Sequence, residues 1–394
     1  MTNANIKKEM QGSFAYFYDN TKRKDGTYGL TEDAYPTNKN LCSIAATGFA
    51  LGAFVLGVEY KYITHKEGEK IITEMLGVLE TIPHKNGFYY HFYDADDYEK
   101  DLDMEVSTID SAILFMGLIV VSSYFGGEIA KRADALVTRA EWCYFADPNT
   151  NSFFMAERHN ERFAHWDHYA EQLMIFVLAA AEGNSCGVAK KYYQNMLKPR
   201  GIYKDISYIY TPTGSLFVHQ FSHAFIDFRG RTDDEGIDWF LNSVNAARAA
   251  HAYAVDHPSK SYNAKSWGLS ACDTRDGYVG GFGNPPRYEN KYLPKDNGTV
   301  PPYAAVASVV FTPKESLDAL DYYYAQGDLT GKYGLYESFN RDQGWVLHKY
   351  LGIDKGITML MLANYEKEII WKLTMKHPLI NKGLENLGII ERGK

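Results

Sequence analysis

The sequence has 394 residues, a formal net charge of −8 and an aromatic content of 15%, with 31 Tyr. The acidic balance and the lack of any Lys/Arg run argue against nucleic acid or an anionic membrane surface as a partner. Tyr and Trp rings combine a flat apolar face with a polar tip and stack well on sugar rings, so a sugar is the expected partner.

Helical periodicity runs through the chain, and almost no alternating strand pattern interrupts it. The segments with this periodicity are residues 6–22, 42–60, 67–81, 108–125, 128–143, 168–181, 188–196, 215–226, 237–253, 313–325, 355–365 and 366–375. Segments 42–60, 108–125 and 168–181 are apolar on all sides, whereas the segments that follow them are apolar on one face or more polar.

This alternation favours a closed double ring, in which an inner barrel of helices is covered by an outer layer. An open solenoid would leave fewer helices buried on all sides. The pattern therefore predicts an all-α fold, an (α/α)6 toroid of about twelve helices, formed by residues 1–394 as a single domain. The longest nearly unbroken apolar stretch, residues 45–58, is too short to span a bilayer.

Two short segments, residues 87–93 and 152–156, are predicted to be extended pieces ahead of buried helices. Residues 254–303 form the longest irregular stretch, and loops of this length in a compact domain are usually functional or disordered. The large aromatic residues considered in this stretch are Trp267, Tyr278, Phe282, Tyr288 and Tyr292. We therefore expect a folded lid over the active site.

The segment 103–110 places three carboxylates immediately ahead of an apolar helix. A Ser followed three residues later by an acid is the pattern of a capping box, so Ser107 is expected to cap a helix that starts at Thr108. Glu105 lies outside that helix and has no capping role, which makes it a candidate catalytic residue. Asp110 either completes the capping box or takes part in the chemistry.

A second acid, Glu171, also stands at the start of a buried helix. Glycosidic bond cleavage usually needs one carboxylic acid to protonate the leaving oxygen and a second carboxylate as base or nucleophile. Burial beside Trp166 and Tyr169 would raise the pKa of Glu171 and keep it protonated as a general acid. The alternative is a structural ion pair between Glu171 and a cation such as Arg162.

His219 and His223 are four residues apart on one face of a predicted helix, a spacing that can bind zinc. The Glu of an H-E-x-x-H motif is missing and no third ligand is evident, so hydrogen bonding in the active site is the favoured interpretation. No metal or other cofactor is expected. Asp227 and Arg229 are expected to form a local ion pair or to contact the substrate.

The four cysteines are far apart and form no C-x-x-C pair, which indicates neither a zinc site nor a disulfide framework and favours reduced thiols. The first ten residues lack the apolar segment of a secretory signal, so a cytoplasmic location is expected. The oligomeric state stays open, because exposed aromatic residues could stack on sugars or form a dimer face.

Seven segments carry a recognisable combination of residues: 87–92 (GFYYHF), 105–110 (EVSTID), 166–171 (WDHYAE), 217–230 (FVHQFSHAFIDFRG), 267–273 (WGLSACD), 297–305 (NGTVPPYAA) and 350–354 (YLGID). Together they resemble the glucoamylase-like family associated with bacterial β-1,2-glucan metabolism. The resemblance extends over most of the chain, from about residue 39 to residue 387.

The resemblance implies an (α/α)6 toroid and glycoside hydrolase activity on β-1,2-linked glucans, with endo-acting, exo-acting and glucanosyl-transferring relatives. Glu105 and Glu171 match the family's candidate catalytic acids, with Asp110 nearby. The family usually follows Ile-Asp with Gln-Gly-Pro, whereas Asp354 is followed here by Lys355-Gly356-Ile357, which changes the contacts at one side of the active site. Many relatives are exported, so a chain without a signal implies processing of imported short oligosaccharides.

We therefore expect Glu171 to be the general acid and Glu105 the base, with the reverse assignment open and Asp110 holding or replacing Glu105. The residues expected to stack on glucosyl units are Trp166, Tyr169, Trp267 and Tyr278. The residues expected to hydrogen-bond hydroxyl groups are His219, His223, Arg229 and Asp273. Three alternatives remain: a transglycosylase on the same substrates, a sugar epimerase or isomerase that uses His219 and His223 as its acid/base pair, and a glycan-binding protein without catalysis.

Overall fold

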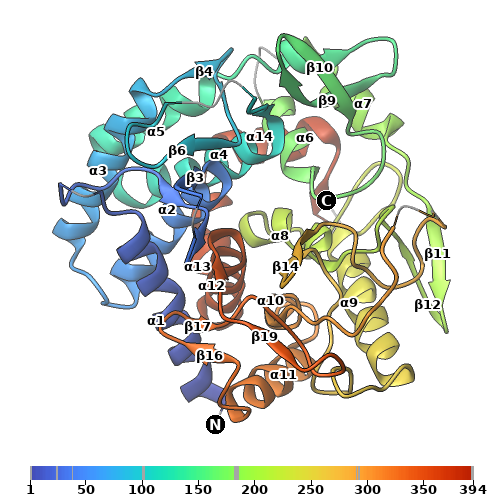
Figure 1. Ribbon diagram of the computed structural model, residues 1–394. Coiled ribbons are helices and arrows are strands. Elements are labelled where there is room, and N and C mark those ends of the chain that lie inside the picture. The colour runs from blue at the N-terminus through green and yellow to red at the C-terminus, as the bar shows by residue number, and fades with distance from the viewer. Residues whose placement is uncertain are drawn as a thin grey trace.

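The computed structural model describes residues 2–23, 25–37, 39–99, 103–181, 186–289, 291 and 293–391. Helices make up nearly half of this part of the chain (Figure 1), which confirms the helical class expected from the sequence. Short strands lie between the helices and are more numerous than the two extended segments that were predicted.

Helices of two kinds alternate along the chain. The more deeply buried ones are α2 (Ile44–Glu59), α4 (Thr108–Phe125), α6 (Leu173–Ala181), α8 (Phe221–Phe225), α10 (Pro302–Val306) and α12 (Gly352–Lys367). α2 buries 14 of its 16 residues, whereas α3 (His65–Thr81) buries 6 of 17. Likewise α4 buries 14 of 18, whereas α5 (Gly127–Thr138) buries 3 of 12. The predicted alternation of buried and one-faced helices is confirmed for these pairs.

The other helices are α1 (Thr2–Asn20), α7 (Ala189–Asn195), α9 (Trp239–Asp256), α11 (Pro313–Ala325), α13 (Ile369–Thr374) and α14 (Pro378–Leu387), with the 3-10 turns η1 (Trp142–Phe145) and η2 (Leu216–His219). Figure 1 shows α1, α3, α5, α9 and α11 at the periphery and α8, α10 and α12 closer to the centre.

Helix boundaries follow local capping signals. α4 and α11 begin and end where the sequence predicts. α2 begins at Ile44 rather than at residue 42, because the Ser43 side chain accepts a hydrogen bond from the N–H of Ala46 and caps the helix. The predicted helix 215–226 is divided at Gln220 into η2 and α8. α10 and α14 fall in segments for which no helix was predicted.

α2 and α4 cross with their backbones in contact. A Cβ atom on Gly117 would lie 2.2 Å from the carbonyl oxygen of Gly48, so only glycine fits at this crossing. By length and composition α4 could cross a membrane, but 78% of it is buried inside the protein, as in a core helix. The crossing belongs to one continuous hydrophobic core that extends from Ile6 to Ile389.

The strands form small antiparallel sheets. The largest sheet has the order β10 (Glu161–His165), β9 (Ser152–Arg158) and β7 (Val106–Ser107), with β8 (Ala146–Asp147) also paired to β9. A second sheet has the order β1 (Thr31–Glu32), β3 (Leu41–Ser43) and β6 (Phe92–Asp94). The two-stranded pairs are β2 (Ala34–Tyr35) with β20 (Tyr350–Leu351), β4 (His84–Lys85) with β5 (Phe88–Tyr89), β11 (Arg200–Tyr203) with β12 (Ile206–Ile209), β13 (Arg231–Thr232) with β21 (Ile390–Glu391), β14 (Cys272–Thr274) with β15 (Gly277–Val279), β16 (Thr330–Gly331) with β17 (Gly334–Leu335), and β18 (Ser338–Asn340) with β19 (Trp345–Leu347).

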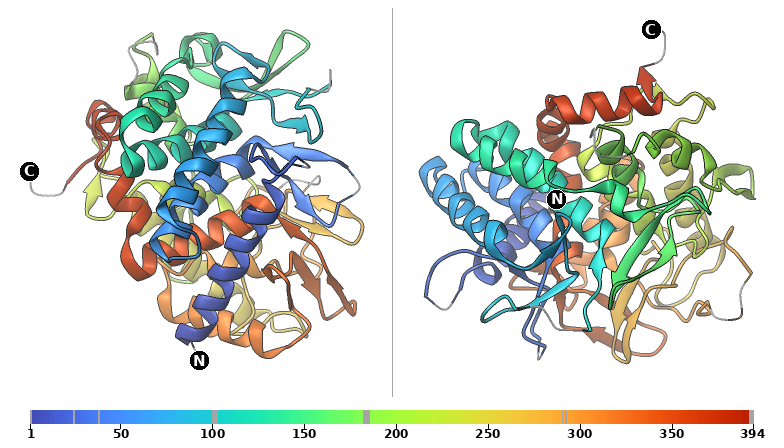
Figure 2. Two further views of the ribbon diagram at one scale, coloured as in Figure 1. Left: turned by 90° about the vertical axis from the view of Figure 1, so that its left-hand side faces the viewer. Right: turned by 90° about the horizontal axis from the view of Figure 1, so that it is seen from above.

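Three of these strands lead directly into buried helices: β3 into α2, β7 into α4 and β20 into α12. The pairings Ser43↔Phe92 and Ser107↔Ala156 fix the residues from which α2 and α4 start. Both views of Figure 2 show most of the strands at one end of the helices, with the C-terminus at the other. We call these the strand end and the opposite end. The N-termini of three buried helices therefore open at the strand end.

The long stretch 254–303 is more regular than predicted, because it contains the end of α9, the β14–β15 hairpin and the first two residues of α10. Its residue Tyr292, named above as a lid residue, lies outside the described residues.

One disulfide joins Cys143 to Cys186, with Cα atoms 5.5 Å apart. It corrects the expectation of four reduced thiols, because the fold brings together two cysteines that are 43 residues apart in the sequence. Cys42 and Cys272 are buried and free.

Candidate active site

Glu105 lies at the strand end, immediately before β7, and two cationic side chains hold its carboxylate. Nδ1 of His91 lies 3.0 Å from Oε1, and Arg158 donates a hydrogen bond to Oε2 over 2.8 Å. The hydrogen bond from His91, together with that from Arg158, outweighs partial burial and lowers the pKa of Glu105 to about 2. Glu105 is therefore ionised at neutral pH.

Asp110, in the first turn of α4, both completes a cap and faces the site. Its N–H donates to Ser107 Oγ over 3.3 Å, and the Ser107 hydroxyl donates back to its carboxylate, which confirms Ser107 as the N-cap. Its other carboxylate oxygen lies 3.6 Å from Nε2 of His91. Burial would lower the pKa of His91, but the charges of Asp110 and Glu105 raise it to about 9. A protonated His91 thus bridges the two acids.

Glu171 lies two residues before α6 and is partly exposed. Its backbone carbonyl accepts a hydrogen bond from the Ser222 hydroxyl over 2.6 Å, which ties the start of α6 to α8. Among the described residues no cation pairs with its carboxyl group, and Arg162 donates instead to the Tyr144 carbonyl. Burial raises the pKa of Glu171 to about 7, and the charge of Asp110 adds to the rise. A carboxyl of this acidity can donate a proton near neutral pH.

A second pair of acids, Glu337 and Asp354, lies nearby and was not predicted as a pair. Both side chains are buried, and burial raises the pKa of each well above its usual range. The two carboxyls hydrogen-bond to each other, while Glu337 Oε2 and Asp354 Oδ2 receive no donor from the described residues. Two carboxyls can bond in this way only if at least one of them is protonated, so the pair carries at most one negative charge.

Asp273 links this pair to the rest of the site. Its N–H donates to Glu337 over 2.9 Å, and its carboxylate forms an ion pair with Lys349. Asp33 is half-buried, and its partial removal from water raises its pKa, while the charges of His91 and Lys349 oppose that rise. Asp33 therefore lies within electrostatic reach of both His91 and Lys349, and so connects the two groups of acids.

Tyr278, at the centre of β15, lies within electrostatic reach of Glu171 and of the Glu337–Asp354 pair. Although 58% of its surface is exposed, protein atoms surround it. This desolvation raises its pKa, and the charges of Asp354, Glu337 and Glu171 add to the rise. Tyr278 is therefore an exposed side chain that lies close to these acids. We use the name acidic recess for Glu105, Asp110, Glu171, Asp273, Glu337 and Asp354, together with His91 and Tyr278.

The three other aromatic residues predicted to stack on sugars are buried. The Trp166 indole donates to Thr108 over 2.9 Å. Tyr169 stacks on Trp239 with ring centroids 4.6 Å apart, and Trp267 is fully buried. These rings belong to the hydrophobic core, and a side chain without exposed surface offers no face to a substrate.

His219 and His223 are also buried, at 2% and 1% exposure, and lie on two separate helical turns. Nδ1 of His219 lies 3.3 Å from the Tyr169 hydroxyl, and Nε2 of His223 lies 3.0 Å from the Ser243 hydroxyl. Burial lowers the pKa of each to about 3. Both are therefore neutral, and they act as interior hydrogen-bonding groups. No group of three His, Cys, Asp or Glu suited to a metal ion occurs in the described parts of the chain.

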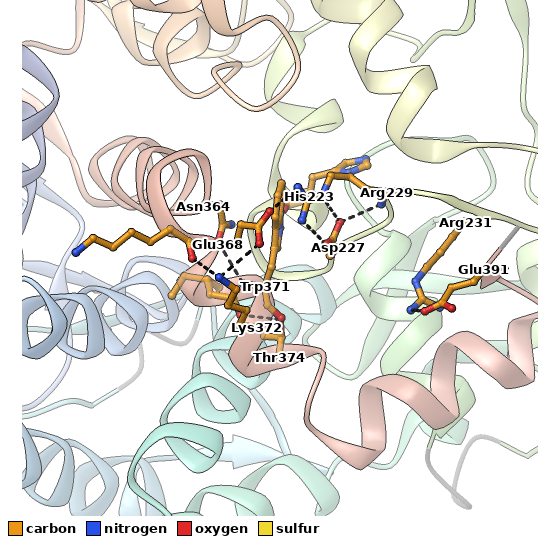
Figure 3. Close-up of polar contacts among 12 residues, drawn as sticks. His223, Asp227, Arg229, Arg231, Asn364, Glu368, Trp371, Lys372, Thr374 and Glu391 are labelled. Carbon is orange, nitrogen blue, oxygen red and sulfur yellow. Dashed lines mark hydrogen bonds and ion pairs between the residues drawn. The ribbon is translucent and has the colours of Figure 1, made fainter. Parts of the chain in front are cut away.

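Arg229 lies at the opposite end of the molecule from the acidic recess. It forms ion pairs with Asp227 and Glu368 and covers the Trp371 ring at 4.2 Å (Figure 3). Glu368 follows the last residue of α12, whereas Asp354 stands in its first turn. A helix of 16 residues is about 24 Å long, so Arg229 cannot reach a substrate bound beside Asp354. The predicted Asp227–Arg229 ion pair is present, and the substrate contact is not supported.

The structure thus brings together Glu105, Asp110, Glu171, Asp273 and Tyr278 from the predicted set. The residues that it adds are Asp33, His91, Glu337, Lys349 and Asp354. A signal existed for His91 and Asp354, which lie in the segments 87–92 and 350–354 that carry the family resemblance. Glu337 and Lys349 had no such signal.

Comparison with known proteins identifies the family. The model of the Glycoamylase family, described as "Putative glucoamylase", matches residues 164–378, more than half of the chain. An exo-β-1,2-glucooligosaccharide sophorohydrolase (non-reducing end) from Parabacteroides distasonis is 24% identical to this chain and aligns with 97% of it. The chain spans 57% of the length of that relative.

Solved structures show the same fold. A "putative glucoamylase" from Bacteroides uniformis superposes with a TM-score of 0.90 at 24% identity, covering 100% of this chain and 98% of that one. An endo-β-1,2-glucanase from Chitinophaga pinensis, solved with sophorotriose and glucose, gives a TM-score of 0.89 at 23% identity and covers 99% of both chains. The resemblance inferred from the seven sequence segments is confirmed, and the chain belongs to the Glycoamylase family.

Proposed function

We propose that this protein is a glycoside hydrolase that cleaves β-linked gluco-oligosaccharides or glucans, with β-1,2 linkages as its preferred substrate. The observation that carries the proposal is the contrast between two carboxyl environments: Glu171 has no cationic partner among the described residues, whereas Glu105 is held by two cations. Such a separation of carboxyl acidities is the arrangement that acid/base cleavage of a glycosidic bond requires. The substrates named for the Parabacteroides and Chitinophaga relatives support the linkage.

Glu171 is the proposed general acid. Its pKa of about 7 keeps a substantial fraction protonated at neutral pH, and its partial exposure lets it reach a leaving oxygen. Asp110 supports this role, because its negative charge disfavours ionisation of Glu171. Tyr278 is the proposed platform for a glucosyl unit, since it combines an open ring with a position between the two groups of acids.

The base has two candidates, Glu105 and the Glu337–Asp354 pair. Glu105, expected from the sequence, has both oxygens engaged by cations and a pKa of about 2, so it is a weak proton acceptor. The Glu337–Asp354 pair carries at most one negative charge and has raised pKa values, which suits proton transfer from water near neutral pH. These environments favour the pair as the base and leave Glu105 the task of fixing His91 and Asp110.

We further propose that the chain forms one domain with the (α/α)6 arrangement. α2, α4, α6, α8, α10 and α12 would form the inner ring, and the less buried helices between them in the sequence would form the outer ring. The burial of alternate helices and the continuous core support this arrangement.

The test is incubation of the protein with a panel of β-1,2-, β-1,3-, β-1,4- and β-1,6-linked gluco-oligosaccharides, followed by NMR of the products during the first turnovers. We expect cleavage of the β-1,2 series, and the anomer first released reports inversion or retention. Elongated products would show transglycosylation, and an isomerised free sugar would show an epimerase. Binding of every oligosaccharide without any conversion would contradict the proposed activity.

The epimerase alternative is less well supported. It needs His219 and His223 as an acid/base pair in contact with a sugar, and both are buried with their pKa values lowered to about 3. A neutral imidazole of such low basicity takes up a proton poorly at neutral pH.

A further inference from the structure

Lys355, the residue after Asp354 in the first turn of α12, has its charge buried in the interior. Only 4% of its side chain is exposed, and its ammonium group forms an ion pair with Glu9 of α1, whose side chain is fully buried. An ammonium group in the interior costs several kcal/mol unless it is well paired, so this pair needs an explanation beyond packing.

The position of Glu9 is fixed from several directions. One carboxylate oxygen accepts hydrogen bonds of 2.9 Å from the N–H of Leu335 and from the Tyr324 hydroxyl, and the other receives the bond from Lys355. Gly334 makes room for it, because a Cβ atom there would lie 2.4 Å from Glu9 Oε2 and the backbone has φ +85°. Glu9 is thus a built-in counterion for Lys355.

The Glu9–Lys355 ion pair and the Glu337–Asp354 pair line the same small cavity. A cavity of about 10 Å³ is lined by Glu9 and Lys355 together with Glu337 and Asp354. Lys355 is close enough for its charge to act on the Asp354 carboxyl. The other described titratable groups around the acid pair are Asp273 and Cys272 on β14, Tyr278 on β15, Lys349 before β20, Tyr350 on β20, Tyr303 on α10 and Tyr336 before Glu337.

We propose that Lys355, anchored by Glu9 of the N-terminal helix, is a positioning residue whose charge acts on the Glu337–Asp354 pair across this cavity and favours one negative charge on it. The pair stands among the negative charge of Asp273 and buried polar groups, and the nearest cations are Lys349 and Lys355. Lys349 binds Asp273 and acts on Glu337, whereas Lys355 acts on Asp354 from within the protein. α1 thereby contributes to the active site without touching a substrate, and this inference rests on the proposed function of the acid pair.

Three variants test the proposal, because two of them should shift the pKa of the acid pair in opposite directions and the third should not shift it. Glu9→Gln/Lys355→Met removes both charges at nearly constant volume, and such replacement of a buried ion pair often preserves stability. A nearby cation lowers the pKa of an acid by roughly 1–3 units. The loss of Lys355 should therefore raise the pKa of the acid pair by about that amount. Glu9→Gln alone leaves the charge of Lys355 without its counterion and should lower the pKa of the acid pair. Lys85→Met, which breaks an ion pair with the buried Glu157, is the matched control and should leave the titration unchanged.

The titration is followed by carboxyl ¹³C NMR of the free protein, with Asp354→Asn used to assign the signals, so this reading needs no substrate. The acid limb of the pH–rate profile on the preferred glucan is the second reading, and it should move in the same direction as the NMR titration. Equal titration curves in all variants, with only a lower Tm, would overturn the proposal and reduce the ion pair to a structural role. An inactive wild-type protein would contradict the proposed function, while the NMR arm would still decide the role of Lys355.

Discussion

The charged residues at the two ends of α12 differ in how they are paired. At the opposite end, Arg229 sits between Asp227 and Glu368, and all three side chains are partly open to solvent. At the strand end, Asp354 hydrogen-bonds to Glu337, and Glu171 has no cation among the described residues. The charges around Arg229 have the partners that stability alone would select, whereas Glu171, Glu337 and Asp354 form no ion pair with a described residue.

This difference separates structural charge from functional charge. Partly exposed ion pairs add little to stability and cost little to place. Buried acids without full partners cost stability, and such groups gather where a protein needs a proton donor or acceptor. The strand end also collects the first turns of α2, α4 and α12, whose positive dipole ends help to hold negative charge there.

Glu171→Gln should have the largest effect on kcat, and it is the strongest test of the distinction between structural and functional charges. Loss of the general acid should lower kcat on unmodified oligosaccharides by about 10²–10⁴-fold. Activity on a 4-nitrophenyl glycoside should fall far less, because that leaving group departs without protonation. Near-normal kcat on the natural linkage would remove Glu171 from the mechanism.

The same variant should be more stable than wild type at high pH. The folded pKa of Glu171 is raised from 4.5 to about 7, so its favourable contribution is complete below pH 4.5 and is lost as pH rises through 7. The glutamine side chain of the variant cannot ionise, so Tm at pH 8 should rise by a few degrees relative to wild type, with little difference at pH 4. An equal Tm difference at both pH values would contradict the buried, protonated state of Glu171.

Asp354→Asn and Glu105→Gln, compared side by side, sharpen the assignment of the base. If the Glu337–Asp354 pair accepts the proton from water, Asp354→Asn should lower kcat by about 10²-fold or more on natural and activated substrates alike. Glu105→Gln should have the smaller effect on kcat, because Glu105 keeps His91 and Asp110 in place. Steady-state kinetics on both substrates measures the two falls in kcat. A larger fall for Glu105→Gln than for Asp354→Asn would indicate that Glu105 is the base.

Tyr278→Ala should weaken substrate binding rather than slow the chemical step. Loss of an aromatic platform is expected to raise KM by about 3–10-fold, since such contacts contribute roughly 0.5–1.5 kcal/mol. Tyr278→Phe retains the ring and should restore most of the affinity. A large fall in kcat for both variants would indicate instead that the hydroxyl takes part in proton transfer.

The sequence predicted those features that depend on neighbouring residues. The capping box at Ser107 placed the start of α4, and the positions of Glu105 and Glu171 ahead of apolar helices marked both as candidates. Aromatic content could not separate roles, because Tyr169 and Trp267 in the core and Tyr278 in the recess contribute equally to composition.

The rest of the site depends on contacts between distant segments. Glu337 follows a short hairpin and carries no local pattern, and it meets Asp354 only when β18 and α12 pack at the strand end. The spacing of His219 and His223 suggested one helical face, but the break at Gln220 and their burial remove both from the recess. The departure at Lys355 suggested altered contacts beside the substrate, whereas its side chain points to Glu9 behind the acid pair.

Arg229→Ala gives the smallest expected effect and tests the other half of the comparison. It removes two partly exposed ion pairs and the contact with Trp371, together worth about 1–2 kcal/mol, so Tm should fall by roughly 2–4 °C. The loss should shrink at high salt, because partly exposed ion pairs are screened. Kinetic constants should match those of wild type, because α12 separates Arg229 from the recess by about 24 Å. A tenfold fall in kcat/KM at unchanged stability would mean that the opposite end is coupled to the chemistry, and that the two ends of α12 do not divide structural from functional charge.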